Sequence, residues 1–129
     1  MNIKEKIHNC LWFSGTSKDK GENFAAKFLK KNGYRIICRN YDVGFAEIDI
    51  IAQKADITAF VEVKQRKSTA YGLPGEAVGR EKQRKIRRAA ESYIANNSLN
   101  GTFRFDVIEI YGACDGSKKP ELKHILNAF

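Results

Sequence analysis

The segment from residue 45 to residue 64 constrains the fold of this chain more than any other. It contains two runs rich in Ile, Val and Phe, residues 45–52 and 57–64, separated by the short polar segment 53–56. Both runs alternate in character, which predicts β-strands, and a linker of this length predicts a hairpin turn. The sequence therefore predicts an antiparallel strand pair at the centre of the fold.

A turn centred between residues 55 and 56 fixes how the two strands pair. One face of the pair is then entirely apolar and should pack on a core; it carries Ile48, Ile50, Ala52, Ala59, Val61 and Val63. On the other face Asp49 lies opposite Glu62, and Glu47 lies opposite Lys64. Like charges directly opposed across two strands are destabilising, so Asp49 and Glu62 require a compensating charge.

A divalent cation would provide that compensation. Mg²⁺ binds through carboxylate oxygens, commonly one or two of them together with substrate phosphate. We therefore expect Asp49 and Glu62 to bind Mg²⁺, for which Mn²⁺ can substitute. Lys64 lies on the same face and could hold a phosphate or help to activate a water. The alternative is that these are solvated strand residues, with Glu47 and Lys64 forming a weak surface pair.

Asp49 followed by Glu62-Val63-Lys64 resembles the Asp…(Asp/Glu)-x-Lys signature of the restriction-endonuclease-like nucleases. A wider set of residues is similar to the bacterial YraN-like family, also called UPF0102, from residue 21 to the C-terminus. That set comprises Gly21-Glu22, Ala25-Ala26, Leu29, Gly33-Tyr34, Asn40, Glu47-Ile48-Asp49, Phe60-Val61-Glu62-Val63-Lys64, Arg66, Lys82, Ala89-Ala90 and Arg104-Phe105-Asp106.

The resemblance implies a restriction-endonuclease-like α/β/α sandwich and a metal-dependent endonuclease similar to the archaeal Holliday-junction resolvases. By that analogy the substrate is branched DNA and the protein acts as a homodimer. Asp49, Glu62 and Lys64 would be catalytic, and Glu22 and Glu47 would add outer carboxylates to the metal site. A non-catalytic nucleic-acid-binding module on the same fold is the alternative, because fold does not fix function. The sequence leaves DNA and RNA both open.

The charge of the chain also favours a nucleic-acid partner. Its 129 residues include 23 Lys and Arg against 15 Asp and Glu, a formal net charge of +8. An excess of that size suggests a polyanionic partner, although a basic protein without one is the alternative. The candidate phosphate contacts are Arg66 and Lys67 after the second strand, and Lys82, Arg84 and Arg87 on a helix.

Helical and strand patterns alternate along the chain. Apolar stripes predict helices over residues 21–32 and 81–96, and further strands are expected over 34–41, 103–111 and 122–126. With the central hairpin this order predicts an α/β fold with a mixed sheet of about five strands. We expect residues 1–20 to be an N-terminal extension and residues 21–129 to be the nuclease-like domain.

The cysteines and the short apolar runs bear on location. Cys10, Cys38 and Cys114 are odd in number and show no zinc or redox spacing, so we expect reduced thiols in a cytoplasmic protein. The apolar run of residues 10–13 is too short for a membrane helix, so no membrane association is expected.

Overall fold

The computed structural model describes residues 19–66, 78–114 and 116–129. In chain order the elements are α2 (Lys20–Lys31), β1 (Arg35–Asp42), β2 (Glu47–Lys54), β3 (Ile57–Arg66), α3 (Arg80–Asn96), β4 (Thr102–Tyr111) and β5 (Glu121–Ile125). Every helix and strand expected after residue 20 is confirmed, with bounds that differ by a few residues. Almost all of the expected extension 1–20, and Lys67, lie outside the described residues.

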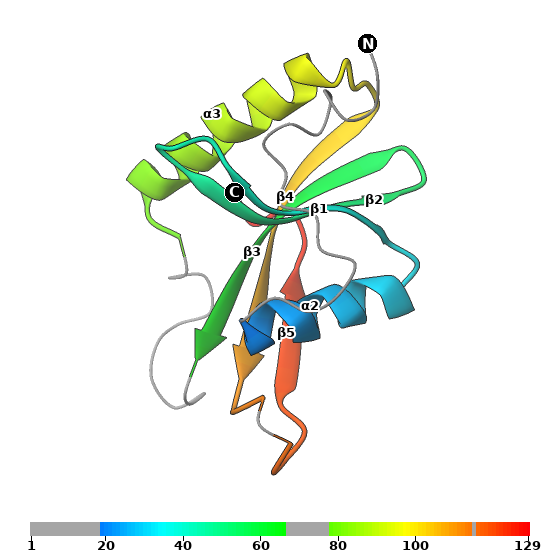
Figure 1. Cartoon of the computed structure of the whole chain (residues 1–129), viewed down its shortest axis with the longest axis vertical. Helices are drawn as coiled ribbons and strands as arrows, with labels where there is room; N and C mark the ends of the chain where they lie inside the picture. The colour runs from blue at the N-terminus through cyan, green and yellow to red at the C-terminus, as the bar shows by residue number, and fades with distance from the viewer. Residues whose placement is uncertain (1–18, 67–77, 115) are drawn as a thin grey trace.

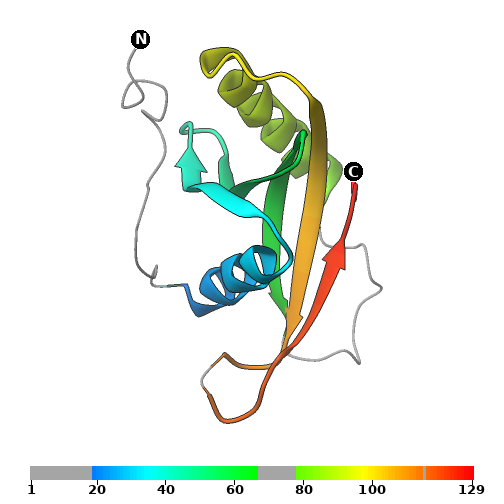
Figure 2. The same cartoon turned by 90° about the vertical axis from the view of Figure 1, so that its right-hand side faces the viewer.

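The five strands form one mixed sheet in the order β1-β2-β3-β4-β5. Strands β3 and β4 are parallel, with α3 connecting them, and the other neighbouring pairs are antiparallel. Figures 1 and 2 show α2 and α3 on opposite faces of this sheet. The predicted α/β architecture with a five-stranded mixed sheet is therefore confirmed, and it is consistent with the restriction-endonuclease-like fold.

Helix α2 begins at a side-chain cap and buries small residues against the sheet. The Asp19 carboxylate accepts a hydrogen bond from the backbone N–H of Glu22 at 3.0 Å, which satisfies one of the unpaired amides of the first turn. Ala25 and Ala26 pack with Leu29 against residues of β2, β3 and β4. Two alanines on this face let the helix lie close to the sheet, which brings Glu22 toward the strands.

Helix α3 covers the opposite face with a larger apolar stripe. Ile86, Ala89, Ala90 and Tyr93 are buried there, as their helical spacing predicts. The ring of Tyr93 meets that of Phe60 edge-on, with 6.2 Å between centroids. This packing fixes α3 over β3, with the first turn of the helix near Glu62.

The hairpin register is confirmed over most of its length. Pairing runs from Lys54–Ile57 to Ile50–Val61, as the turn position predicts. It ends there, so both of the expected polar pairs, Asp49 with Glu62 and Glu47 with Lys64, lie beyond the paired part of the strands. The two strands therefore separate at the point where Asp49 and Glu62 are found.

A bend in β1 and β2 corrects one detail of the predicted faces. Ile48 packs with Ile51 in the cluster under α3, whereas Ile50 and Ala52 pack under α2. The expectation that Ile48 shares a face with Ile50 is therefore wrong. Asn40, beside this part of β2, has φ +53°, a left-handed conformation that Asn adopts more readily than most residues. Strict alternation of faces is lost at this bend.

The structure tests the expectations about the cysteines and about membrane-spanning segments. Cys114 lies outside any disulfide, but Cys38 is disulfide-bonded, so the expectation that all the cysteines are reduced thiols is wrong for Cys38. The cysteines thus give no support to a cytoplasmic location. Across the described ranges, neither helix has the length and apolar character needed to span a membrane.

Candidate functional site

Four acidic side chains from three elements gather where β2 and β3 separate. Glu22 comes from α2, Glu47 and Asp49 come from β2, and Glu62 comes from β3. Their proximity is visible in their electrostatic effects, since Glu62, Glu22 and Glu47 each raise the pKa of Asp49. The structure thus places the other three predicted metal-site residues close enough to Asp49 to affect its ionisation.

Asp49 lies at the centre of this cluster. Its Oδ2 accepts a hydrogen bond from the backbone N–H of Val63 at 2.8 Å. The side chain takes over an amide that the separating strand β2 no longer pairs, and this fixes the carboxylate beside Glu62. Burial, followed by the charge of Glu62, raises the pKa of Asp49 to about 8. Asp49 is therefore mostly protonated at neutral pH in the metal-free protein.

Two lysines approach Glu62, which is buried. Lys82 of α3 donates to its Oε1 at 2.5 Å, and the Nζ of Lys64 lies 3.9 Å from the same oxygen. Burial alone would lower the pKa of Lys82, but its hydrogen bond to Glu62 raises it above the usual value. Burial and the neighbouring Lys82 lower the pKa of Lys64. Lys82 is therefore held as a cation, while Lys64 releases its proton more readily than an ordinary lysine.

Glu22 and Glu47 are joined by Asn40. With its carboxamide nitrogen facing the acids, Asn40 donates to Glu22 Oε1 at 2.8 Å and to Glu47 Oε1 at 2.9 Å. The reverse orientation would place an oxygen against carboxylate oxygens, so this one is assigned from the hydrogen bonds. Arg39 approaches Glu22 at 3.9 Å.

The outer acids also resist ionisation. Burial and then the charge of Asp19 raise the pKa of Glu22 to about 7. Burial, followed by Asp42 and Glu62, raises the pKa of Glu47. The raised pKa values reflect burial and the crowding of negative charge. A bound cation would lower them, because a nearby positive charge favours the ionised carboxylate.

The donor set fits a hard divalent cation in its chemistry. Carboxylate oxygens are the ligands that Mg²⁺ and Mn²⁺ prefer. Within the part of the chain that the structure describes, however, no three acidic, His or Cys side chains already surround a common point. Lys82 instead occupies one oxygen of Glu62. Lys82 therefore competes with a metal ion for this oxygen of Glu62.

The predicted phosphate-contacting residues have partners within the protein. Arg66 donates to the buried Glu109 at 3.1 Å, and Arg84 pairs with Glu81 at 2.7 Å. Arg87 lies 5.7 Å from the ring centroids of both Phe105 and Phe129. The Arg84 pair is exposed and therefore weak, so Arg84 can exchange Glu81 for a phosphate, whereas Arg66 is held by a buried carboxylate. Lys67 lies outside the described residues.

Asn40 and Arg39 are the site residues to which sequence reasoning gave no role. Asn40 carries part of the family resemblance but has no recognisable catalytic spacing. Its contribution depends on the left-handed φ that turns its side chain toward Glu22 and Glu47. An Asn within a strand pattern is a weak signal of such a bend, because Asn tolerates that conformation.

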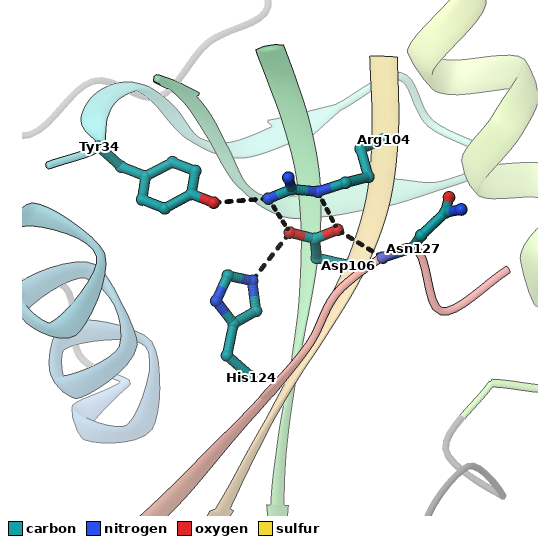
Figure 3. A network of polar contacts seen from close by, with 5 residues as sticks. All are labelled: Tyr34, Arg104, Asp106, His124 and Asn127. Atoms are coloured by element: carbon teal, nitrogen blue, oxygen red, sulfur yellow. Dashed lines mark hydrogen bonds and ion pairs between the residues drawn. The ribbon is translucent and has the colours of Figure 1, made fainter. Parts of the chain in front are cut away.

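A second polar network lies on the α2 side of the sheet (Figure 3). Arg104 donates twice to Asp106, with both distances 2.8 Å, and also to the hydroxyl of Tyr34 at 2.6 Å. The remaining partners of the Asp106 carboxylate are the His124 ring at 2.8 Å and the Asn127 backbone N–H at 3.0 Å. Both oxygens of this buried carboxylate are thus engaged within the protein, which indicates a structural role for Asp106.

Comparison with known proteins gives one consistent result. A family model described as "Uncharacterised protein family UPF0102" matches residues 21–110. A UPF0102 protein from Alkaliphilus metalliredigens is 47% identical over 110 residues, which cover 84% of this chain and 93% of the relative. A UPF0102 protein from Clostridium acetobutylicum is 50% identical over 112 residues, covering 86% and 91% respectively. The names of these relatives state no activity.

Proposed function

The chain belongs to the UPF0102 family, and we propose that it is a metal-dependent endonuclease in which Asp49, Glu62 and Lys64 carry the chemistry. The observation that carries this proposal is the pair of crowded carboxylates, Asp49 and Glu62, at the point where β2 and β3 separate. A pKa of about 8 for Asp49 means that the metal-free site binds a proton, which reduces the repulsion between the crowded carboxylates. Groups with strongly shifted pKa values and a specific charge partner are typical of functional sites.

In this proposal Asp49 and Glu62 hold Mg²⁺ or Mn²⁺, and Glu22 and Glu47 form an outer ring of negative charge. Such an ion, when bound, would lower the pKa of a water and stabilise charge on a phosphate. The Val63 N–H orients Asp49 through the 2.8 Å hydrogen bond. Asn40 holds Glu22 and Glu47 in place.

The two lysines take different roles. Lys64, whose pKa is lowered, is suited to orient a water or to donate to a phosphate oxygen. Lys82 neutralises Glu62 until metal and substrate arrive, and is then released to contact the phosphate. The release of Lys82 thereby couples the arrival of the substrate to the exposure of Glu62.

The substrate is nucleic acid. The net charge of +8 supports a polyanion. DNA, and branched DNA in particular, follows from the resemblance to junction-resolving enzymes, and so does a homodimer. Sedimentation of the protein with a four-way junction tests the dimer; a single protomer per junction at micromolar protein would contradict it.

One observation favours a second function, that of a nucleic-acid-binding module without cleavage. Lys82 lies 2.5 Å from Glu62, and the acids are not arranged around a common point. A closed site of this kind would persist if metal never displaced the lysine. The protein would then bind nucleic acid with the same affinity in the presence and absence of Mg²⁺.

A cleavage screen separates the two functions. Four-way junctions, flaps, linear duplex and single strands of DNA, together with RNA, are incubated with Mg²⁺ or Mn²⁺. Asp49→Asn is the test variant, and Asp56→Asn, which changes an exposed aspartate in the β2–β3 turn, is the matched control. The endonuclease proposal predicts cleavage by wild type and the control and loss of activity by orders of magnitude in Asp49→Asn. Cleavage at the wild-type rate by Asp49→Asn would remove Asp49 from the chemistry.

A further inference from the structure

A cleft lined by lysines lies between α2 and the connection from β4 to β5. Its volume is about 490 Å³. Figures 1 and 2 show this connection, in orange, beside the helix drawn in blue. The residues that matter for its chemistry are Lys20, Lys27, Lys118, Lys119, Phe24 and Cys114. None of the predicted nucleic-acid contacts is among them.

The geometry of α2 explains half of this lining. Lys20 and Lys27 are seven residues apart and therefore lie on one face of the helix, two turns from each other. Ala25 and Leu29, which pack on the sheet, lie on another face. The helix thus carries Glu22 into the acidic cluster and presents two lysines to the cleft.

Among the described lining residues of the cleft, the charged side chains are all lysines. Lys118 and Lys119 face the two lysines of α2 from the β4–β5 connection, and the described lining contains no Asp or Glu. Over the described residues, none of the four lysines forms an ion pair. Lysines gathered around a hollow without acidic partners form a positive potential that attracts an anion with several charges.

The cleft is connected to the acidic cluster through the end of β3. Gln65 directly follows Lys64, and its Nε2 donates to Gly112 O at 3.3 Å and reaches Cys114 Sγ at 4.0 Å. A Cβ atom at Gly21 would lie 2.8 Å from Gln65 Oε1, so the first turn of α2 lies directly against the end of the Gln65 side chain. Helix, strand end and connection therefore form one continuous surface.

A second hollow lies at the end of β3. It measures about 380 Å³ and is lined by Gln65, Arg66, Gly112 and Ala113. Arg66 pairs with Glu109. The end of β3, through Gln65 and Arg66, thus borders the same β4–β5 connection that lines the lysine cleft.

We propose that the lysine cleft binds the sugar-phosphate backbone of the nucleic acid on one side of the acidic cluster. This inference rests on the proposed function and assigns the part of the protein that holds the substrate beyond the reacting phosphate. A strand that passes Lys64 meets Gln65 and Arg66 and then reaches Lys118 and Lys119. Because lysines bind phosphate as point charges, the contact is independent of base sequence.

Occupancy of the cleft is tested by the reactivity of Cys114. The wild-type protein is alkylated with a small maleimide in EDTA, and modification of Cys114 is followed by peptide mass spectrometry. A saturating DNA duplex, or its single strand, is expected to slow the alkylation of Cys114 at least several-fold. Inorganic phosphate, at a concentration matched in phosphate groups, is the arm for a small-anion site. Slowing by inorganic phosphate alone, or no slowing by any nucleic acid, would overturn the proposal.

Charge variants provide the second measurement. Lys118→Gln/Lys119→Gln removes two cleft charges, and Lys30→Gln/Lys31→Gln removes two exposed charges from the last turn of α2. Each lost phosphate contact lowers the slope of log K against log salt by about 0.9 for a duplex. We expect a decrease of about 1.8 in the cleft variant and no comparable change in the control. Equal decreases in both, or none in the cleft variant, would show that the cleft does not contact the backbone.

Failure of this inference and failure of the proposed endonuclease are distinguishable, because both binding measurements are made without metal. If no substrate is ever cleaved but Cys114 is protected and the slope falls, the cleft stands and the endonuclease proposal fails. If cleavage depends on Asp49 while Cys114 stays reactive, only the cleft assignment fails. Absence of binding to any nucleic acid would overturn the cleft assignment as well.

Discussion

Asp49→Asn should make the metal-free protein more stable, and the gain should grow with pH. The pKa of Asp49 is raised to about 8, by burial first and by Glu62 second. In the unfolded chain the same carboxyl titrates near its ordinary value, with a pKa of about 4. Between these values the folded protein holds a proton that the unfolded chain has lost. As far as Asp49 is concerned, the free energy of unfolding is therefore highest at low pH and falls as the pH rises toward 8.

The size of the effect follows from linkage. Within that window one proton more in the folded state changes the free energy of unfolding by about 1.4 kcal/mol per pH unit. Between pH 5 and pH 7 the wild type should lose about 2.7 kcal/mol through Asp49, a loss that Asn avoids. Asn also keeps an oxygen that can accept the Val63 N–H, so the substitution preserves the 2.8 Å hydrogen bond. Glu22, with its pKa raised to about 7, acts in the same direction in both proteins.

Urea unfolding at pH 5, 6 and 7 in EDTA measures this difference. The stability of Asp49→Asn minus that of wild type should rise by about 2.7 kcal/mol over the series. Mg²⁺ should stabilise wild type more than the variant, because a ligand stabilises the state to which it binds. A difference that stays constant with pH would show that Asp49 is not crowded in the folded protein and would refute this account of the cluster.

Three further perturbations address other parts of the structure. Asp106→Asn should cost about 3–5 kcal/mol in urea unfolding, because it breaks the buried pair with Arg104; a cost below about 1 kcal/mol would contradict that role. Burial opposes ionisation of Asp106, but its hydrogen bonds outweigh this and lower its pKa, so its stabilising effect should be lost below about pH 4. Lys82→Met should tighten Mn²⁺ binding in calorimetry several-fold, because Glu62 no longer has a competing partner; weaker binding would mean that Lys82 positions Glu62. Arg84→Glu should reduce the salt dependence of nucleic-acid binding without unfolding the protein, and an unchanged slope would assign that helix face to solvation.

The central hairpin was predictable because its signals are local. Alternation sets the strands, and the length of the 53–56 segment sets the register, which the structure confirms from Lys54–Ile57 to Ile50–Val61. The bend that carries Ile48 to the other face was not predictable. It lies beside Asn40, which has a left-handed φ on the neighbouring strand, and the sequence offers only the general tolerance of Asn for that conformation.

The site shows the same division between local and long-range signals. The expected strand pairing singled out Asp49 and Glu62, and the apolar stripe of residues 81–96 placed Lys82 on a helix, from which it reaches Glu62. Glu22 was assigned to the site only through the family resemblance, because no local sequence pattern links α2 to β2.

Contacts between distant segments carry no local signature. Arg104 and Tyr34 are 70 positions apart in the chain, and Gln65 and Gly112 are 47 apart. The Asp106 network and the lysine cleft are assembled from such pairs. Both therefore required the fold before they could be seen.

Proton release on metal binding tests the central claim most directly. Titration calorimetry of Mn²⁺ into wild type at pH 7, repeated in buffers with different ionisation enthalpies, counts the protons released. Asp49 and Glu22, with pKa values of about 8 and about 7, should together release about one proton or slightly more as the ion binds. The same titration at pH 9 should release almost none, and Asp49→Asn should bind Mn²⁺ far more weakly. Wild type that binds neither Mn²⁺ nor Mg²⁺, or an Asp49→Asn variant that binds as tightly and releases as many protons, would contradict a metal site at Asp49 and Glu62.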